Sequence, residues 1–544
     1  MSKQDQQHIG KQLRDLQSLL AHAKEAEQQA EAIVGTLRDR YVNPDSYPVS
    51  EQLHTNLENL RIIFRGSGDV VIREFTIAAL NRPAAVVFTE SMADPQIIAN
   101  QIIEKLSLPP LSGLAPCPAE GCDVTYLKST LLTAAAFTEE SGMQAIVRRI
   151  LSGDAALWIE GSASVIIIAT QKLESRDVAE PQSEPNIRGP REGFTEELRT
   201  NVTLLRRRMP NPNLVVRQTV VGSRSHTDVA IIYFRGIANY KLVFEVENRI
   251  DRLDIDMPIG GNEIQGLIED HPNSPFPTLL ATERPDKVLS SVMEGRVAIL
   301  VNGSPFALLT PTTLADFFQA GDDYYENWIT ASIIRLTRYV AAFFAMTMPA
   351  LYVAITTFHP GLIPPPLTLT ITTSRTGIPL PAFLEAVIME IMLEVMQESG
   401  VRLPKNIGPA VSIAGSLVIG EAAVRAGIVS SPLVIITAFT AVASFVIPNY
   451  RLSMTIRFFR VPLMMLAASF GMFGLTMGMI AILVHLSLLE SFGEPYIAPF
   501  APKNLSRISD LKDTFISAPP EAQVSRPAYL EPQDSQKQKP ESKP

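Results

Sequence analysis

The sequence predicts a multi-pass α-helical membrane protein that carries an N-terminal two-part α/β (or α+β) domain in the cytoplasm. The first observation is a change in composition: charge is sparse from residue 339 to about residue 489, whereas the residues before them are charged and mixed. The second is residues 339–358, an uncharged apolar run about as long as a bilayer crossing requires. The third is the pair Arg335 and Arg338 at the start of this run, which by the positive-inside rule places the preceding domain in the cytoplasm.

These changes divide the 544 residues into six segments. In chain order they are a helical heptad arm (1–50), a first cytoplasmic α/β subdomain (51–173), a linker rich in Pro, Glu, Ser and Arg (174–200), a second cytoplasmic α/β subdomain (201–330), a transmembrane helical domain (331–489) and a disordered tail rich in Pro and charge (490–544). The function is therefore expected to couple a soluble domain to a membrane region.

Composition also restricts the classes of function. The net charge of −9 argues against nucleic acid as a partner, because phosphate binding needs clustered Lys and Arg. Cys117 and Cys122 have no further Cys or His at metal-ligand spacing, so neither a disulfide framework nor a zinc site is expected. The sequence contains no phosphate-binding loop, dinucleotide fingerprint, HExxH or nucleophile elbow. We therefore expect no enzyme activity, no cofactor and no bound metal.

The heptad arm contains a seam of apolar residues with a charged interruption. The residues from Ile9 to Leu37 follow alternating steps of four and three, but Glu27 stands in the seam between two alanines that bury little area. A solvated helical arm is therefore favoured over a partner-binding coiled coil.

The two cytoplasmic subdomains alternate short β-branched runs with helix-like stretches, which predicts α/β or α+β subdomains with mainly buried sheets. In the first subdomain the strand-like runs are 62–64, 69–77, 84–88 and 164–170, and the helix-like stretches are 95–106 and 127–151. In the second, strands are predicted at 214–221, 229–235 and 297–301, a helix near 240–252, and a hairpin turn at 302–304.

An apolar helix that contains carboxylates is predicted at residues 379–398. A charge at membrane depth costs several kcal/mol, so each of these side chains needs water or a partner. At about 100° per residue, Glu390, Glu394 and Glu398 lie on one side of the helix, and Glu385 is turned well away from them. These four glutamates form the candidate ion pathway, with Glu385 as its weakest member.

The remaining apolar segments leave two alternatives open. Residues 410–430 and 432–447 are either two spans or a re-entrant hairpin, and Glu421 and Arg425 in the first are spaced to neutralise each other on one helix face. Residues 461–489 form either one long tilted helix or a broken pair of helices. Gly474 and Gly478 make a GxxxG pattern that permits close helix packing.

Four stretches of the sequence occur together and in order. They are SPFPTLLATERPDKVLSSVMEGRVAILVNGSPFALLTPTT (274–313), DFFQAGDDYYENW (316–328), RTGIPLPAFLEAVIMEIMLEVMQESGVRLP (375–404) and VASFVIPNYRLSM (442–454). They resemble the A subunits of spore germinant receptors, the GerA family, and the resemblance is close over roughly residues 204–502. It implies a multi-pass protein of the spore inner membrane that works with a transporter-like B subunit and a lipoprotein C subunit. In this family the complex senses nutrients and starts germination with release of monovalent cations, and the A subunit is thought to form a homo-oligomeric ion pathway.

The acidic helix has two interpretations. In the first, copies of the helix face a common axis, and rings of Glu390, Glu394 and Glu398 attract cations. In the second, the glutamates pair with Arg402, Lys405 or Arg425 and only hold the bundle together. We favour a pathway for Glu390 and Glu394 and structural pairing for Glu421 with Arg425. A secondary transporter that uses buried carboxylates for ion coupling is the alternative function, and it ranks lower because the sequence shows no matched halves.

Overall fold

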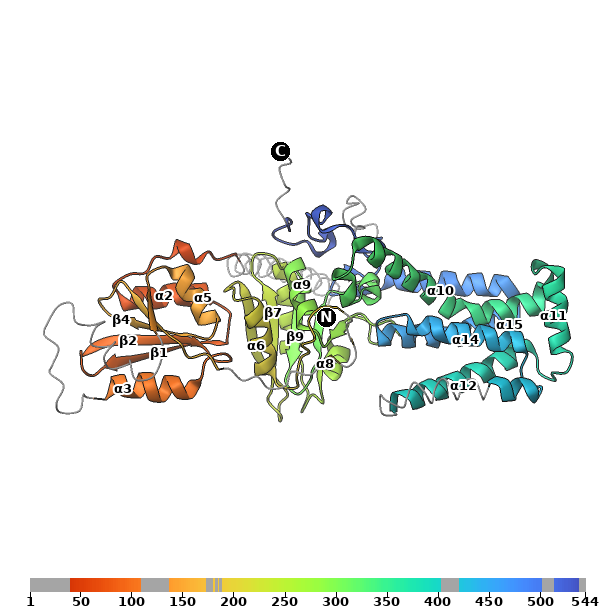
Figure 1. Ribbon diagram of the computed structural model, residues 1–544, viewed down its shortest axis with the longest axis horizontal. Helices are drawn as coiled ribbons and strands as arrows, with labels where there is room; N and C mark the ends of the chain where they lie inside the picture. The colour runs from red at the N-terminus through yellow and green to blue at the C-terminus, as the bar shows by residue number, and fades with distance from the viewer. Residues whose placement is uncertain are drawn as a thin grey trace, which may run out of the picture.

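The computed structural model describes residues 40–108, 137–172, 180–181, 184, 188–402, 420–500 and 513–537. The molecule is elongated, with subdomain 1 (residues 53–168), subdomain 2 (residues 198–310) and a helical bundle (residues 328–488) arranged one after another (Figure 1). Most of the predicted heptad arm, and residues 501–512 and 538–544 of the predicted tail, lie outside the described residues. We call the end of the bundle against subdomain 2 the near end, and the opposite end the far end.

Subdomain 1 is a five-stranded antiparallel sheet with helices on both faces, so it is α+β rather than α/β. Helices α2 (Leu53–Ile63) and α5 (Met143–Leu151) cover one face, and the π-helix η2 (Ile97–Ile103) with α3 (Glu104–Ser107) covers the other. The strand order is β1-β2-β4-β5-β3, with β1 (Val70–Ile77), β2 (Arg82–Thr89), β3 (Phe137–Glu140), β4 (Ala155–Ile159) and β5 (Val165–Ile168).

Subdomain 2 has the same plan. Helices α6 (Leu198–Arg208) and α9 (Pro285–Glu294) cover one face of its sheet, and α7 (Tyr240–Asp251) with α8 (Gly261–Ile268) covers the other. The strand order is β6-β7-β9-β10-β8, with β6 (Leu214–Val221), β7 (Thr227–Phe234), β8 (Leu280–Thr282), β9 (Val297–Val301) and β10 (Ala307–Thr310). All its strand pairs are antiparallel.

The two subdomains repeat each other down to individual hydrogen bonds. In α2, the buried Asn56 side chain accepts the Ser50 N–H at 2.8 Å and donates to the Ser50 carbonyl at 2.6 Å. In α6, Asn201 binds Thr195 in the same way, at 2.7 and 2.6 Å. These contacts hold the residue that lies three positions before each helix against the first turns of that helix, because the amide side chain pairs with both backbone groups of Ser50 or Thr195. The sequences SEQLHTN (50–56) and TEELRTN (195–201) are therefore equivalent, and sequence analysis missed this internal repeat.

A buried ion pair joins the two subdomains. Arg206 of α6 donates to Asp69, which precedes β1, at 2.8 Å from Nε and 2.9 Å from Nη2, and both side chains are at most 1% exposed. The Gly68 N–H adds a hydrogen bond of 2.9 Å to the carbonyl of Val216 in β6. Because a bidentate pair fixes orientation as well as distance, this joint holds the two sheets in a defined relation.

The helical bundle runs to and fro between its two ends. Helix α10 (Trp328–Phe358) leads from subdomain 2 to the far end, where α11 (Pro365–Arg375) lies, and α12 (Ala382–Arg402) runs back to the near end (Figure 1). Helices α14 (Ser431–Phe445) and α15 (Tyr450–Leu488) complete the described part of the bundle. Because residues 403–419 lie outside it, the alternatives for 410–430 stay open.

Helix α15 is a broken pair, which decides one alternative that the sequence left open. Gly471 has non-helical dihedral angles, φ 62° and ψ −140°, and at this point the chain turns back toward the near end. A Cβ on Gly474 would lie 2.1 Å from the Leu466 carbonyl oxygen, and one on Gly478 would lie 2.6 Å from a methyl carbon of Leu463. The predicted close packing at these glycines is therefore confirmed, between two arms of one hairpin.

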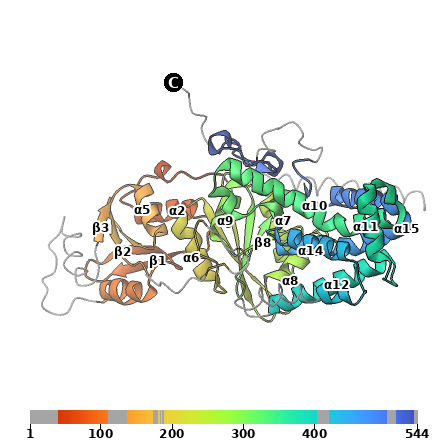
Figure 2. The same cartoon turned by 45° about the vertical axis from the view of Figure 1, so that its right-hand side comes forward.

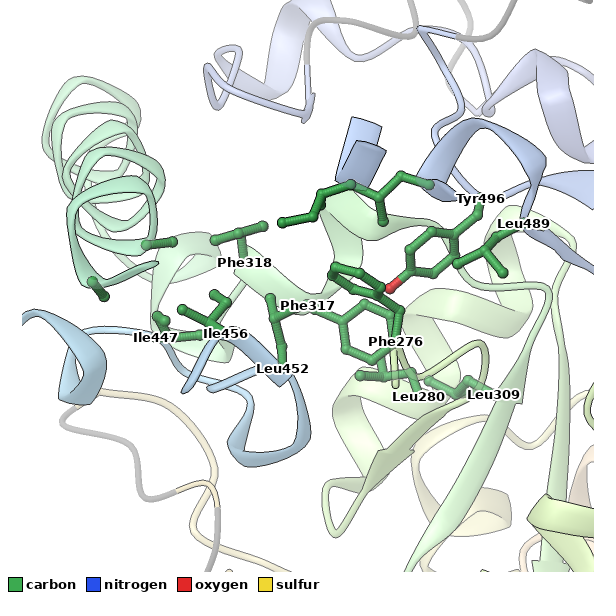
Figure 3. Packing of buried hydrophobic residues seen from close by; sticks show 14 of the residues in the cluster. Phe276, Leu280, Leu309, Phe317, Phe318, Ile447, Leu452, Ile456, Leu489 and Tyr496 are labelled. Carbon is green, nitrogen blue, oxygen red and sulfur yellow. The ribbon is translucent and has the colours of Figure 1, made fainter. Parts of the chain in front are cut away.

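Among the described helices, α10 and α15 are long and apolar enough to cross a membrane, judged by length and composition, and α14 is apolar but shorter. The bundle and subdomain 2 share one continuous apolar core. Figure 3 shows Phe276, Leu280 and Leu309 of subdomain 2 close to Leu452 and Leu489, which begin and follow α15. This shared core fixes the near end of the bundle to the sheet, since apolar burial is the main stabilising contribution in such an interface.

The C-terminal segment corrects the prediction of a disordered tail. Residues 490–500 begin with the strand pair β11 (Glu490–Ser491) and β12 (Glu494–Pro495), and Tyr496 is fully buried. Residues 513–537, which we call the C-terminal strap, lie over subdomain 2 and the start of α10 (Figure 2). Composition did not predict this ordered structure, because the apolar contacts come from a few side chains, including Tyr529 and Leu530, within an otherwise polar segment.

Several other predictions can be compared with the structure. The strands predicted at 214–221 and 297–301 coincide with β6 and β9, and the turn at 302–304 joins β9 to β10 as a hairpin. The strand-like run at 62–64 is wrong, because these residues end the amphipathic helix α2. The helix predicted at 127–151 is too long, since β3 occupies Phe137–Glu140, and the linker ends earlier than expected because α6 begins at Leu198.

Candidate functional site

The carboxylates of α12 lie beside arginines of neighbouring segments. Helix α12 packs against α10, α14 and α15, and its outward side chains Leu384, Ile391 and Val395 are 43–64% exposed. Its acidic side chains differ in exposure: those of Glu385 and Glu390 are 0% and 12% exposed, whereas that of Glu394 is 52% exposed.

Glu390 lies within the bundle and pairs with the buried Arg460 of α15. The guanidinium Nη1 lies 3.1 Å from Glu390 Oε2, and the Glu390 side chain is 12% exposed. Arg460 also donates to the Ala345 carbonyl at 2.6 Å and to the Thr440 carbonyl at 3.4 Å, so it connects α10, α12, α14 and α15. The other carboxylate oxygen of Glu390, Oε1, is buried and has no hydrogen-bond partner among the described residues.

Glu394 lies one turn nearer subdomain 2 and is half exposed. Arg457 Nη1 lies 3.2 Å from its Oε2, and the same guanidinium contacts the Gln397 side chain. Glu398 follows on the same side of α12 and lines a cavity of about 210 Å³ at the near end, together with Gln397, Arg457 and residues at and beside the turn between α14 and α15, which include Ile447 and Tyr450. Glu390, Glu394 and Glu398 therefore form a row along α12 that leads from the interior of the bundle to the near-end cavity.

Glu385 belongs to a different network at the far end. It is fully buried, lies 3.1 Å from Arg375 Nη2 and accepts the Ser430 N–H at 3.1 Å, just before α14. The Ser430 hydroxyl in turn bonds the Tyr352 hydroxyl at 3.0 Å. Glu385 thus caps α14 and joins it to α10 and to the end of α11, as expected for a carboxylate that accepts N–H groups at a helix start.

Glu421 and Arg425 pair with each other as their spacing predicts, with Nη2 2.5 Å from Oε1. Their side chains are 58% and 78% exposed, so they lie on the outside of the described structure. Neither of them contacts α12 by an ion pair or hydrogen bond within the described part of the chain.

The described partners of the acidic helix come from two other helices, α11 and α15. Glu385, Glu390 and Glu394 pair with Arg375, Arg460 and Arg457. Of the partners named from the sequence, Arg425 pairs with Glu421 instead, and Lys405 and the Arg402 side chain lie outside the described residues. A signal was available, because the spacing of Arg457 and Arg460 on one helix complements that of Glu390 and Glu394 on another. Residue spacing alone, however, does not determine which two helices pack against each other in the tertiary structure.

The described residues offer little for other chemistry. Among them, no group of three or more His, Cys, Asp or Glu side chains is placed to hold a metal ion. The acidic row, which paired arginines neutralise in part, can attract and hold small cations.

Comparison with known proteins bears on these features. A family model described as "Bacillus/Clostridium GerA spore germination protein" matches residues 58–529, which include both subdomains, the bundle and most of the strap. The chain belongs to the GerA family. The resemblance noted in the four sequence stretches is therefore confirmed.

Relatives of GerA type match along nearly the whole chain. Spore germination protein KA of Bacillus subtilis is 37% identical over 502 residues, which cover 91% of this chain and 90% of the relative. Spore germination protein B1 of the same organism is 36% identical and covers 90% of this chain and 100% of its own. The "uncharacterized membrane protein YfkQ" of B. subtilis is 39% identical over 88% of this chain and 91% of its own.

A solved structure also matches, titled "Crystal structure of the N-terminal domain of the A subunit of the Bacillus megaterium spore germinant receptor GerK3". It is 29% identical, covers 50% of this chain and 98% of its own, and has a TM-score of 0.39. Family membership thus rests on the sequence matches. As a member of the GerA family, the chain is a spore germination protein, and one of its relatives is described as a membrane protein.

Proposed function

We propose that this GerA chain is the A subunit of a nutrient germinant receptor in the spore inner membrane. In this proposal the bundle crosses the membrane several times, subdomains 1 and 2 lie in the cytoplasm, and the chain works with a transporter-like B subunit and a lipoprotein C subunit. Nutrient binding to the complex favours an open arrangement through its differential affinity, and copies of the chain assemble around a cation-conducting path.

The observation that carries the proposal is the row of carboxylates on α12 beside a bundle that shares its core with subdomain 2. Glu390 keeps one buried oxygen that has no hydrogen-bond partner among the described residues, and Glu394 is 52% exposed. A chain retains such groups at membrane depth at considerable cost, which favours a functional role. Because the bundle and the sheet share a core, a movement of subdomain 2 is transmitted to the helices.

Oligomerisation places the row in its proposed role. The outward face of α12 carries Leu384, Ile391 and Val395 next to Glu394, and all four are exposed in the single chain. Packing this face against a second copy would bury the apolar side chains and bring carboxylates of neighbouring copies around one axis. Arg457 and Arg460 would then set how much of the negative charge faces the path, while Glu385 keeps its capping role at α14.

A single substitution tests the pathway. Glu394→Gln keeps the size of the side chain, removes its charge and leaves Arg457 without its carboxylate, so cations are attracted less. A loss of about 1.4 kcal/mol of attraction corresponds to roughly a tenfold lower rate of transfer, and we expect cation release from variant spores to fall by at least this factor. The measurement is monovalent cation release and loss of optical density, after exposure to a panel of amino acids, sugars and nucleosides.

The matched control is Glu421→Gln, which removes a carboxylate from an exposed pair outside the row. Variant spores that carry this control are expected to release cations as the wild type does, because the substitution leaves Glu398 unchanged, as well as Glu390 and Glu394 with their arginine partners. Unchanged cation release with Glu394→Gln, at normal protein level, would remove Glu394 from the path.

A secondary transporter remains the second candidate, and the break at Gly471 is the observation that favours it. Transporters of this class bind ions at interrupted helices near the membrane midplane. Here the break lies between the two arms of α15, at the far end of the bundle and close to Phe358 and His359. This position, away from the middle of the bundle, ranks the transporter below the cation path. Saturation of cation flux with cation concentration and strict coupling to a second solute would favour the transporter, whereas uncoupled flux favours the path.

A further inference from the structure

The C-terminal strap is fastened to subdomain 2 at the end of α9. Arg526 Nε donates to the Met293 carbonyl at 2.8 Å, and the Tyr529 hydroxyl accepts a hydrogen bond from Arg296 at 2.9 Å. Gln533 adds two bonds of 2.9 Å, from its backbone N–H to the Ile237 carbonyl and from its side chain to the next carbonyl. These contacts are to backbone carbonyls and a buried arginine, so the position of this half of the strap is well defined.

The other half of the strap is fastened to the first turns of α10. Arg335 of α10 is fully buried and donates to Asp513, at 2.9 Å to Oδ1 and at 2.8 Å to the carbonyl oxygen. The Ser517 N–H donates to the Ser332 hydroxyl at 3.0 Å, and the Phe515 ring lies edge-on against Tyr339 with centroids 4.6 Å apart. One continuous segment therefore connects α9 of subdomain 2 to α10 of the bundle (Figure 2).

The charges at this junction show why Asp513 is needed. Arg335 and Arg338 both enter the junction from α10, and they share the single buried carboxylate of Asp323, at 3.3 and 2.7 Å. Asp513 supplies a second carboxylate from the strap. Since a buried charge without a partner is costly, removing Asp513 leaves two guanidiniums with one carboxylate and weakens the first turns of α10.

The strap is also separable from the structure that it bridges. Its apolar contacts are few: Tyr529 and Leu530 form a small cluster with Ala498, and Phe515 and Ile516 are 39% and 57% exposed. Segments with few apolar contacts open locally at low free-energy cost without global unfolding. Asp513 itself is 30% exposed, so water reaches the contact that holds α10.

We propose that the C-terminal strap is a coupling clamp, which holds the start of α10 to α9 of subdomain 2 and passes the movement of that subdomain to the bundle. Asp513 is the contact on which the clamp depends at α10, and the segment 526–533 fixes it to subdomain 2. With the clamp attached, subdomain 2 and the first turns of α10 move together; with it detached, these turns open independently.

Amide hydrogen exchange of the purified full-length chain in detergent tests the clamp. The variant is Asp513→Asn, and we expect residues 329–337 of α10 to exchange about tenfold faster than in the wild type, while β9 is unchanged. The matched control is Asp534→Asn, because Asp534 belongs to the strap and pairs with Arg526 but is 56% exposed and does not contact α10. This control should leave exchange in α10 at the wild-type rate.

Two outcomes would overturn the proposal. Equal exchange of residues 329–337 in Asp513→Asn and wild type means that the strap does not hold α10. Faster exchange throughout subdomain 2 means that the strap is needed for folding rather than for coupling. A second variant that ends at residue 512 separates these cases further, because loss of the clamp predicts faster exchange at α10 and at the end of α9 with β1 and β2 unchanged.

The functional consequence rests on the proposed receptor function, whereas the exchange experiment does not. Spores with Asp513→Asn are expected to respond more slowly to nutrients at normal protein level. Germination without nutrient would contradict the clamp, because it would show that the strap restrains the bundle instead of driving it. If exchange changes as expected and germination does not, the clamp stands and the receptor function fails.

Discussion

Two arginines occupy equivalent positions in the repeated subdomains and differ sharply in their surroundings. Arg206 in α6 is fully buried and bridges to Asp69, whereas Arg61 at the same place in α2 pairs with Glu74 at 3.1 Å, with both side chains 57% exposed. The pair at the joint should therefore be far more important for stability than the pair at the surface. Neutralising the carboxylates one at a time, with Asp69→Asn and Glu74→Gln, compares them directly.

The size of the difference follows from burial. Breaking a buried ion pair by removing one partner costs about 3–5 kcal/mol, whereas an exposed pair contributes about 0–1 kcal/mol. Arg206 keeps the carbonyls of Leu214 and Asn211 as acceptors at 2.7 and 3.2 Å, so we expect the lower end, about 3 kcal/mol, for Asp69→Asn. At about 1.4 kcal/mol per factor of ten, the population of the open joint rises roughly a hundredfold.

Amide exchange in α6 and in residues 64–69 measures this opening in the full-length chain. Exchange should accelerate roughly a hundredfold with Asp69→Asn and less than about fivefold with Glu74→Gln. Replacing both partners, Asp69→Leu with Arg206→Met, should recover much of the loss, because no charge is then left buried alone. Equal effects of the two single substitutions would refute the reasoning from burial.

Two further predictions follow from the junction and the hairpin. Glu294 lines a cavity of about 190 Å³ beside Lys537. Burial raises the pKa of its carboxyl to about 7, although the nearby positive charges of Arg296 and Lys537 act to lower it. Because this folded-state pKa lies above the ordinary value of 4.5 for a glutamate, the folded chain holds an extra proton between these two values, and the free energy of unfolding falls as pH rises from 4.5 to 7. Glu294→Gln should remove up to about 3 kcal/mol of this pH dependence of stability. The measurement is the difference in Tm between pH 5 and pH 8 for wild type and variant. An unchanged difference in the variant would show that Glu294 is not the group that titrates. Gly474→Ala should force the two arms of α15 apart and lower the yield of folded chain in detergent, because the added Cβ would clash with the Leu466 carbonyl oxygen. The control Gly361→Ala should leave the yield unchanged, because its Cβ meets open space. Equal yields of the two variants would show that the arms can separate freely.

Much of the fold could be predicted from local pattern. The strands of subdomain 2 are short β-branched runs bounded by turn residues, and β6, β9 and the β9–β10 hairpin were placed correctly on that basis. Local pattern failed at the end of α2. Ile62 and Ile63 resemble the start of a strand because both are β-branched, but they lie in the last turn of this helix. The repeat was also readable, since Asn56 and Asn201 end matching seven-residue sequences, but only a comparison of the chain with itself reveals it.

The candidate site was predictable in part. Hydropathy placed carboxylates in an apolar helix, and their angular spacing separated Glu385 from the others, as the two networks in the structure show. The partners were not predictable, because Arg460 lies 70 residues from Glu390 in sequence. The strap was missed for the same reason: Asp513 acquires its role only from Arg335, 178 residues earlier in the chain.

The length of α10 gives its attachment at subdomain 2 a mechanical consequence. Its 31 residues span about 46 Å at 1.5 Å per residue. Its last residue, Phe358, lies directly beside Gly471, where α15 reverses direction. If the helix pivots as a rigid lever, a tilt of about 5° at its base displaces this tip by about 4 Å, which is roughly three-quarters of the 5.4 Å rise of one helical turn. A small rotation of the sheet would thus be amplified at the opposite side of the bundle, where the chain reverses direction.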